Sequence, residues 1–423
     1  MDIENIRIGI VGLGYVGLPL ACLFAKRYHV DGLEINHERV NNLLRAKDDT
    51  GEVDAATLTD RLKGNLHLTT NAEDLRDCNV YIICVSTPVD ETNNPDLNPL
   101  RVASATVGGL LKKGDVVIYE SSVFPGCTEQ ICVPMLGNRS GLTFNADYFV
   151  GYSPERINPG DKEHTVENIT KIVSGSTPET LDFVEKLYES VLTNGTCRAS
   201  SIRVAEAAKV VENTQRDVNI ALMNELCTVF RAMGISTTEV LDCASTKWNF
   251  LDVRPGLVGG HCIGVDPYYL IHGAWTYNVY PRLIMEARVI NENMAHFVSG
   301  VLTKYMMNKR VHVVDSRILI LGFAFKANCP DTRNTKVESV YSCLRRITDH
   351  VSVYDPIVNR DEVAQRYHIQ LLDNLEDHKG EFDAIILCVG HKEFMSMQFR
   401  PLLNENGILF DAMNVLPDAD FYL

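Results

Sequence analysis

The sequence predicts an α/β protein in which two doubly wound parallel-sheet domains are joined by a central all-helical domain. Short apolar strands alternate with helical stretches near both ends of the chain, as a doubly wound sheet requires. Between them, residues 201–233 are almost free of Gly and Pro and carry an apolar stripe, which predicts one helix about 50 Å long at about 1.5 Å per residue. We therefore expect domains at 1–198, 199–305 and 306–423.

The composition is that of an ordinary globular protein. The chain has 423 residues, 45% of them hydrophobic, and its net charge of −15 argues against a general affinity for nucleic acid or anionic membranes. No apolar run reaches the roughly 18 residues of a membrane span, and the first residues lack the features of a signal peptide, so we expect a cytoplasmic protein. The 12 cysteines show no CxxC pair and no regular His/Cys spacing, so reduced thiols and no metal are expected.

The first domain begins with the strand, glycine turn and helix of a Rossmann dinucleotide site. An apolar strand at 6–11 runs into Gly12-Leu13-Gly14-Tyr15-Val16-Gly17, and a helical pattern follows. Glu34 ends the next strand, at 29–33, where an acidic side chain accepts hydrogen bonds from the adenosine ribose and would repel a 2′-phosphate. The motif predicts NAD rather than NADP. The alternative is a helix cap followed by a surface glutamate.

Further strands are expected at 80–85, 116–120, 148–151 and 171–173. The first two end in turns that contain Thr87 and Ser122, at the strand ends where open α/β sheets bind ligands. As isolated turns they would carry no functional information, because Ser, Thr and Pro are common in turns.

A cysteine on a glycine-rich bend is the most informative feature of the chain. Residues 255–267 read PGLVGGHCIGVDP, with Cys262 four residues before Asp266. Four glycines let the backbone pass close to a ligand, which favours a nucleophilic thiol over a buried structural cysteine.

The long helix predicts two further features. Lys209 and Asn213 lie four residues apart on one face, where they could form an oxyanion site or a solvated surface pair. The helix is longer than one small domain, and a second copy of the chain would most simply cover its exposed apolar face.

The last third of the chain predicts a second Rossmann-like unit, with strands at 317–321, 351–354, 384–389 and 408–410. The loop after its first strand contains Lys326 and Arg333 but no GxGxxG. It could hold a phosphate group, or it could be a surface loop with incidental cations.

In this order the motifs resemble the UDP-glucose/GDP-mannose dehydrogenase family over nearly the whole chain. The likeness is closest to the branch that acts on UDP-N-acetylgalactosamine or UDP-N-acetylglucosamine in surface-polysaccharide synthesis, and residues 152–161 and 259–269 carry it. The resemblance implies an enzyme that oxidises C6 of the sugar twice with two NAD⁺. It also implies a homodimer formed through the central helix and a third domain that binds UDP.

The resemblance assigns a role to each site residue. Cys262 would form a thiohemiacetal and then a thioester, Lys209 and Asn213 would stabilise the oxyanion, and Asp266 would transfer protons with Lys209 and a water. Glu155 and Ser122 would hold the water that hydrolyses the thioester. The implied cofactor contacts are Gly12, Gly14, Tyr15, Val16, Gly17, Glu34, Arg39, Thr87, Ser122 and Arg333. The implied substrate contacts are Glu155, Arg156, Lys209, Asn213, Arg254, Gly259, Arg288, Phe325 and Lys326.

Some positions depart from the family pattern. Glu34 replaces an aspartate and Ser122 a threonine, while Ala287 and the pair Met413-Asn414 replace residues near the nucleotide. Pro159 and Val265 stand where enzymes of UDP-glucose carry Glu and Lys, which favours an N-acetylated sugar.

Several alternatives stay open. The configuration at C4 of the sugar is not predicted, and UDP-N-acetylmannosamine or UDP-glucose are alternative substrates. A two-electron 3-hydroxyacid dehydrogenase and a catalytically silent NAD- and UDP-sugar-binding protein are the rival functions.

Overall fold

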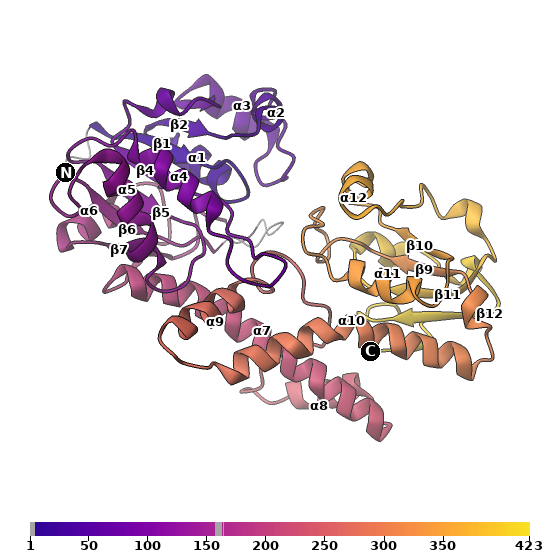
Figure 1. Cartoon of the computed structure of the whole chain (residues 1–423). Helices are drawn as coiled ribbons and strands as arrows, with labels where there is room; N and C mark the ends of the chain where they lie inside the picture. The colour runs from indigo at the N-terminus through magenta and orange to yellow at the C-terminus, as the bar shows by residue number, and fades with distance from the viewer. Residues whose placement is uncertain (1–4, 157–162, 164) are drawn as a thin grey trace. The chain divides into compact units, whose positions relative to one another are not determined.

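The structure, a computed structural model, describes residues 5–156, 163 and 165–423. It contains two compact units, residues 1–212 with 268–280 and residues 213–267 with 281–423. The predicted fold class is confirmed: a parallel-sheet α/β fold lies at each end of the chain and a long helix lies in the central part (Figure 1). The three predicted domain boundaries stay a prediction.

The first unit is built on an eight-stranded sheet, flanked by helices (Figure 1). The strand order is β3-β2-β1-β4-β5-β6-β7-β8, so the chain reverses its direction of winding between β1 and β4. The strands are β1 (Arg7–Val11), β2 (His29–Leu33), β3 (Leu66–Thr69), β4 (Val80–Ile83), β5 (Val116–Tyr119), β6 (Phe149–Tyr152), β7 (Lys171–Gly175) and β8 (Thr196–Arg198).

One pair of neighbouring strands in this sheet differs from the predicted parallel arrangement. β6 and β7 run antiparallel, with Gly151 opposite Gly175, whereas the other pairs are parallel. An apolar run shows that a strand is buried but not in which direction it runs, so the sequence could not reveal this reversal.

The helices of the first unit close a core against the sheet. Those that precede residue 200 are α1 (Gly17–Phe24), α2 (His37–Leu44), α3 (Ala55–Lys63), α4 (Asn98–Gly108), α5 (Val133–Ser140) and α6 (Pro178–Glu189). Leu20 and Phe24 of α1 are fully buried in one cluster with Ile8 and Ile10 of β1. This packing sets the glycine turn at the carboxyl end of β1.

The central part of the chain is helical, as predicted. It contains α7 (Ile202–Met233), α8 (Thr237–Ser245), α9 (Asp266–Thr276) and α10 (Arg282–Asn308). The helix expected at 201–233 is therefore confirmed as a single helix of 32 residues. No helix of the described residues is long and apolar enough to cross a membrane.

The second unit contains a five-stranded sheet in which every pair of neighbours is parallel. The order is β10-β9-β11-β12-β13, with β9 (Ile318–Leu321), β10 (Val351–Tyr354), β11 (Phe382–Leu387), β12 (Leu403–Asp411) and β13 (Phe421–Tyr422). The helices α11 (Val337–Arg345) and α12 (Arg360–Tyr367) belong to this unit.

Both faces of the second sheet are buried. Ile318 and Ile320 of β9 pack into a core with α10 and α11, while Leu319 and Leu321 point to a second core on the other face. This double burial explains why β9 reads as an unbroken apolar run.

Candidate active site

The glycine turn after β1 has the geometry of a dinucleotide site. Gly12 has φ +91°, and a Cβ on Gly17 would lie 1.8 Å from the Gly12 carbonyl oxygen, so α1 can approach the turn only without a side chain there. A Cβ on Gly14 would meet no atom within 4 Å, so this position faces open space. The turn therefore leaves room for a pyrophosphate at the start of α1, and the residues present fit NAD.

Glu34 is held against this turn by backbone donors. Its carboxylate accepts hydrogen bonds from the N–H of Leu13 at 3.1 Å and of Asn36 at 3.0 Å. Arg39 holds the other side of the turn, because its Nε donates to the Leu13 carbonyl at 2.6 Å while its guanidinium pairs with Asp48 at 3.1 Å. Glu34 and Arg39 thus both contact the glycine turn, and their contacts with the cofactor stay a prediction.

The two hydroxyl-bearing turns of the first unit lie together. The Ser121 hydroxyl donates to the Val85 carbonyl at 2.6 Å, which joins the turn of Thr87 to the turn of Ser122.

The buried carboxylate of Glu206 accepts hydrogen bonds from the N–H of Gly126 at 2.5 Å and of Thr128 at 2.9 Å. Burial outweighs these donors and raises the pKa of Glu206 to about 7.

Glu155 belongs to a buried charge network in the first unit. Lys171 Nζ lies 2.8 Å from a Glu120 carboxylate oxygen and 3.1 Å from one of Glu155, and all three side chains are almost completely buried. Tyr188 also donates to Glu120. Burial raises the pKa of Glu120 to about 7, and Lys171 only partly offsets this. The network fixes the Glu155 carboxylate through a lysine that the sequence analysis did not single out.

In the second unit, the loop that carries Cys262 ends on a buried acid–amide pair. Asn213 Nδ2 donates to Asp266 Oδ2 at 2.6 Å, and both residues are at most 5% exposed. The Asp266 N–H donates in turn to the Cys262 carbonyl at 2.8 Å. The structure therefore brings together three of the predicted catalytic residues, and Cys262 itself is partly exposed.

The same loop is clamped to the loop after β9. Asn334 Nδ2 donates to the Gly260 carbonyl at 2.8 Å, and the Gly260 N–H donates to the Asn334 carbonyl at 3.2 Å. A Cβ on Gly260 would lie 2.7 Å from the ring of Phe325, so only glycine fits this contact. The clamp sets the thiol loop against Phe325 and the neighbouring Lys326.

His261 joins these two loops beside the thiol. Arg333 donates to His261 Nε2 at 3.0 Å and binds the Asp331 carboxylate through Nε at 3.0 Å and through NH2 at 2.8 Å. Burial and the Arg333 charge lower the pKa of His261 to about 4. His261 is therefore neutral at pH 7, which matches its role as an acceptor from a guanidinium.

A second buried pair supports the loop that carries Lys326. Asp355 Oδ2, at the end of β10, accepts from the N–H of Phe323 at 2.6 Å and of Ala324 at 3.1 Å, and His391 Nε2 lies 3.0 Å away. His391 Nδ1 accepts from the Asn328 N–H at 2.9 Å, so its proton is on Nε2 and points at Asp355. Although burial opposes ionisation, His391 and these donors hold the pKa of Asp355 below its usual range.

Three family descriptions match successive parts of the chain. The NAD binding, central and UDP binding domains of the UDP-glucose/GDP-mannose dehydrogenase family match residues 6–192, 203–293 and 319–418. The chain belongs to this family.

Curated relatives and solved structures agree with this membership. UDP-N-acetyl-D-glucosamine 6-dehydrogenases from Pseudomonas aeruginosa and Salmonella typhi are 50% and 47% identical to the chain, which covers 98% and 97% of their lengths. The structure of a UDP-D-ManNAc dehydrogenase from Pyrococcus horikoshii superposes with a TM-score of 0.90 at 33% identity, covering 99% of this chain and 98% of that one. The chain is thus an NAD-dependent nucleotide-sugar dehydrogenase, as the resemblance implied.

Two arginines of this family member lie in surroundings that the sequence did not indicate. Arg288 is 2% exposed and pairs with Asp217 at 2.5 Å, so it joins α10 to α7 inside the second unit. Arg254 is exposed and pairs with Asp242 and Asp252, each at 2.7 Å. Arg254 also lines a cavity of about 250 Å³, whose other walls include Thr238, Asp242, Met413 and Asn414. The substrate roles of both arginines stay predictions.

The remaining predicted residues occupy the following places. Lys209 is buried on α7, and its carbonyl accepts from Arg156 at 3.2 Å. Tyr15, Val16 and Thr87 are partly buried beside the glycine turn and after β4, and Gly259 lies in the clamped loop. Residues 157–161 of the sugar-recognition stretch, with Pro159, lie outside the described residues.

Sequence reasoning missed three residues that position the site: Lys171, His261 and Asn334. Only His261 had a signal, because it directly precedes Cys262 in the glycine loop.

Proposed function

We propose that this enzyme oxidises C6 of a UDP-N-acetylhexosamine, with UDP-N-acetylglucosamine as the first candidate, to the uronic acid for surface-polysaccharide synthesis in the cytoplasm. The observation that carries the proposal is the Cys262 loop, which is held by the Asn213–Asp266 pair and clamped to the loop of Lys326. The relatives that act on UDP-N-acetyl-D-glucosamine support this sugar over its C4 epimer, and Val265 supports an N-acetylated sugar over glucose.

Cys262 supplies the covalent chemistry. Its thiolate adds to the C6 aldehyde to give a thiohemiacetal, and the second oxidation converts this to a thioester. Water then adds to the thioester carbon, the C–S bond breaks, and the thiolate leaves from the carboxylate product. NAD, when bound, accepts one hydride in each of the two oxidations.

Lys209 and Asn213 provide positive charge and an N–H donor for this chemistry. They lie one turn apart on α7, and one amide hydrogen of Asn213 is directed to Asp266. The second amide hydrogen and the Lys209 ammonium stabilise the oxyanion, and the ammonium favours the thiolate form of Cys262. Asp266 exchanges protons with a water.

Glu155 and Ser122 serve the hydrolysis step. The Glu155 carboxylate is fixed by Lys171 at 3.1 Å, and Ser122 lies in the turn that is joined to the Val85 carbonyl. A carboxylate held in this way can orient a water and accept its proton.

The UDP portion is bound by the second unit. Lys326 lies in the loop after β9, which Asn334 clamps to the Cys262 loop, and its ammonium suits a phosphate of UDP. Arg333 of the same loop is held in a bidentate contact with Asp331 and is assigned to the cofactor.

The enzyme acts as a homodimer through α7. Val204, Val211, Leu222 and Val229 are each between 44% and 52% exposed, and their spacings of 7, 11 and 7 residues place them within about 20° of one line along the helix. A second copy that packs along this stripe would bury all four side chains.

The test is the number of NADH formed per sugar nucleotide consumed, with UDP-N-acetylglucosamine, UDP-N-acetylgalactosamine, UDP-N-acetylmannosamine and UDP-glucose offered separately. We expect two NADH per molecule of UDP-N-acetylglucosamine. A ratio of one would support a simple two-electron dehydrogenase, and NAD binding without turnover on any of the four would support the silent binding protein. Turnover of UDP-glucose alone would overturn the assignment of the sugar.

A further inference from the structure

A cluster of metal-ligating side chains lies at the amino-terminal edge of the first sheet. His29, Asp31 and His67 each offer one ligand atom, and these atoms lie within 4.8 Å of one another. The glycine turn and Glu34 lie at the opposite, carboxyl edge, which is where open α/β sheets bind cofactors. The cluster is therefore separate from the site of NAD.

Strand register brings the three side chains together. Asp31 is the direct partner of His67 across the β2–β3 pair, and His29 lies two residues before Asp31 on the same face of β2. The rings of His29 and His67 meet edge to face with centroids 4.7 Å apart. The arrangement follows from the backbone pairing of the sheet, not from chance contact between mobile surface side chains.

Asp31 is the buried centre of the cluster. It is 6% exposed, and both of its oxygens lie 3.1 Å from His29 Nε2. Cys78, which is fully buried, donates to the same carboxylate at 3.5 Å. A supporting donor of this kind orients a ligating carboxylate in known metal sites.

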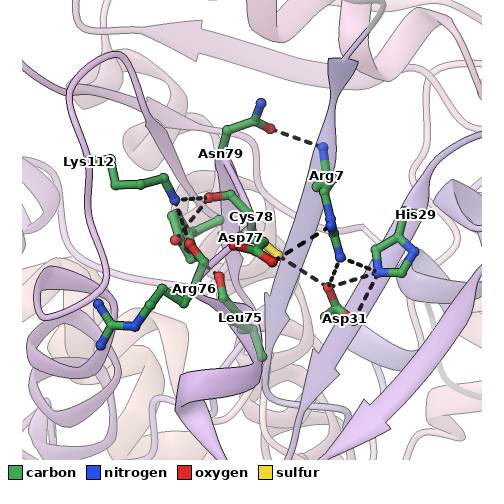
Figure 2. A network of polar contacts seen from close by, with 10 residues as sticks. Arg7, His29, Asp31, Leu75, Arg76, Asp77, Cys78, Asn79 and Lys112 are labelled. Carbon is green, nitrogen blue, oxygen red and sulfur yellow. Dashed lines mark hydrogen bonds and ion pairs between the residues drawn. The ribbon is translucent and has the colours of Figure 1, made fainter.

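The positively charged guanidinium of Arg7 lies beside two of the ligand residues, His29 and Asp31 (Figure 2). One guanidinium nitrogen lies 3.1 Å from His29 Nε2 and 3.9 Å from Asp31 Oδ2. The side chain of Arg7 is 44% exposed, and Asp77 already lies 3.9 Å from it, so Arg7 can keep a carboxylate partner while leaving His29 and Asp31. The cluster thus attracts a cation, and the present one is displaceable.

We propose that His29, Asp31 and His67 form a binding site for a divalent transition-metal ion of the zinc type. Two imidazoles and one carboxylate are a donor set that such ions accept, at bond lengths of about 2.0–2.2 Å with water in the remaining position. The ligand atoms need to approach one another by roughly an ångström, which the exposed His67 can supply. The ion would cross-link the edge strand β3 to β2.

This inference departs from the sequence-based expectation that the protein holds no metal. That expectation rested on ligand spacing along the chain, whereas His29 and His67 are brought together only by the pairing of two strands.

The test is titration of the full-length metal-free enzyme with Zn²⁺, followed by calorimetry and by amide hydrogen exchange of β3. We expect the His67→Ala and His29→Gln variants to bind at least roughly 10- to 100-fold more weakly. We expect Arg7→Gln to bind more tightly than the wild type, because the competing cation is gone. Bound Zn²⁺ should slow exchange in β3 of the wild type and not of His67→Ala.

The matched control is His312→Ala, because His312 forms an exposed pair with Asp315 at 2.8 Å outside the cluster. It should leave Zn²⁺ binding unchanged. The proposal would be overturned if the wild type and the His67→Ala variant bound Zn²⁺ with the same affinity and stoichiometry. Zn²⁺ would then bind only at thiols or histidines outside the cluster. If the Arg7→Gln variant bound Zn²⁺ more weakly than the wild type, the inference that Zn²⁺ displaces Arg7 from His29 and Asp31 would be wrong. NADH formation in the absence of Zn²⁺ reports on the proposed function separately.

Discussion

Cys262 is distinguished from the buried cysteines by its surroundings. It is partly exposed on a glycine loop beside a buried Asn–Asp pair, whereas Cys22, Cys84 and Cys388 are buried, with thiol pKa values that burial raises. The thiolate is the nucleophilic form of cysteine, so the buried residues are inert at neutral pH.

Replacement of Cys262 by Ser should therefore abolish formation of the uronic acid. We expect net oxidation to fall by at least about 10³-fold, because an alcohol near its ordinary pKa is a poor substitute for a thiolate. Binding of NAD, measured by fluorescence titration, should be unchanged. Cys197→Ser, at an exposed cysteine of β8, is the control and should retain full activity. An active Cys262→Ser variant would contradict the thioester mechanism.

His261 links the stability of the second unit to pH. Its pKa is lowered from 6.5 to about 4 in the folded protein, so the unfolded chain binds a proton below pH 6.5 that the folded chain does not. The contribution of His261 to stability is therefore lost as the pH falls from about 6.5 toward about 4.

His261→Gln should remove this dependence, because the amide oxygen can still accept from Arg333. Between pH 7.5 and pH 5 the free energy of unfolding should decrease in both proteins, and the decrease should be about 1–2 kcal/mol smaller in the variant than in the wild type. This difference is discounted for solvent screening because the His261 side chain is 31% exposed. Urea unfolding at the two pH values measures the difference. The exposed His312→Gln should behave as the wild type, and an equal loss in His261→Gln would contradict the shifted pKa.

At the scale of elements, β7 contributes a buried cation to two carboxylates that follow β5 and β6. Lys171 begins β7, Glu120 follows β5 and Glu155 follows β6, so three strands depend on one ion cluster. Although burial opposes its charged form, the pKa of Lys171 is raised by Glu120 and Glu155. Both carboxylates lose their compensating charge if the lysine is removed.

Lys171→Met should destabilise the enzyme by about 3–5 kcal/mol, because it leaves buried carboxylates without a counter-ion. Thermal unfolding measures the loss, and a second change, Glu120→Gln, should recover part of it. Lys113→Met is the matched control. Lys113 is 77% exposed and pairs with Asp147 at 3.0 Å, so its loss should cost about 1 kcal/mol or less. Equal effects of the two changes would contradict the importance of the buried network.

At the scale of the whole molecule, the apolar stripe of α7 predicts the state of association. Four half-exposed apolar side chains on one line of a 32-residue helix form an apolar surface that is unfavourable in water, and such surfaces mark interaction sites. Other large apolar side chains of the central region are also exposed, among them Trp248 at 96% and Leu283 at 70%.

Leu222→Glu should convert the dimer to a monomer. A charge at the centre of the stripe would be buried without a partner in the dimer and hydrated in the monomer. Sedimentation velocity should give twice the 47.3 kDa mass for the wild type and the single mass for the variant. Val102→Glu, at a 55% exposed valine of α4, should stay dimeric. A monomeric wild type would refute the proposed interface.

Much of the fold follows from local sequence patterns. The strand at 29–33 and the helix at 201–233 were predicted to within a residue, because burial on both faces and a helical apolar stripe leave plain patterns. β3, β8 and β13 were missed. All three are short and lie at an edge of their sheet, where their side chains are mostly not buried. They are strands because they pair with a neighbouring strand, and their composition does not reveal this pairing.

The sequence by itself determined the glycine turn, Glu34, the Cys262 loop and the Lys209–Asn213 spacing, because each is a local arrangement that chain geometry alone dictates. Only the tertiary structure decided the Lys171 network, the contact of His261 with Arg333 and the cluster of His29, Asp31 and His67. These groups depend on strand register and on burial that strengthens charge interactions, and both arise only when distant segments pack together.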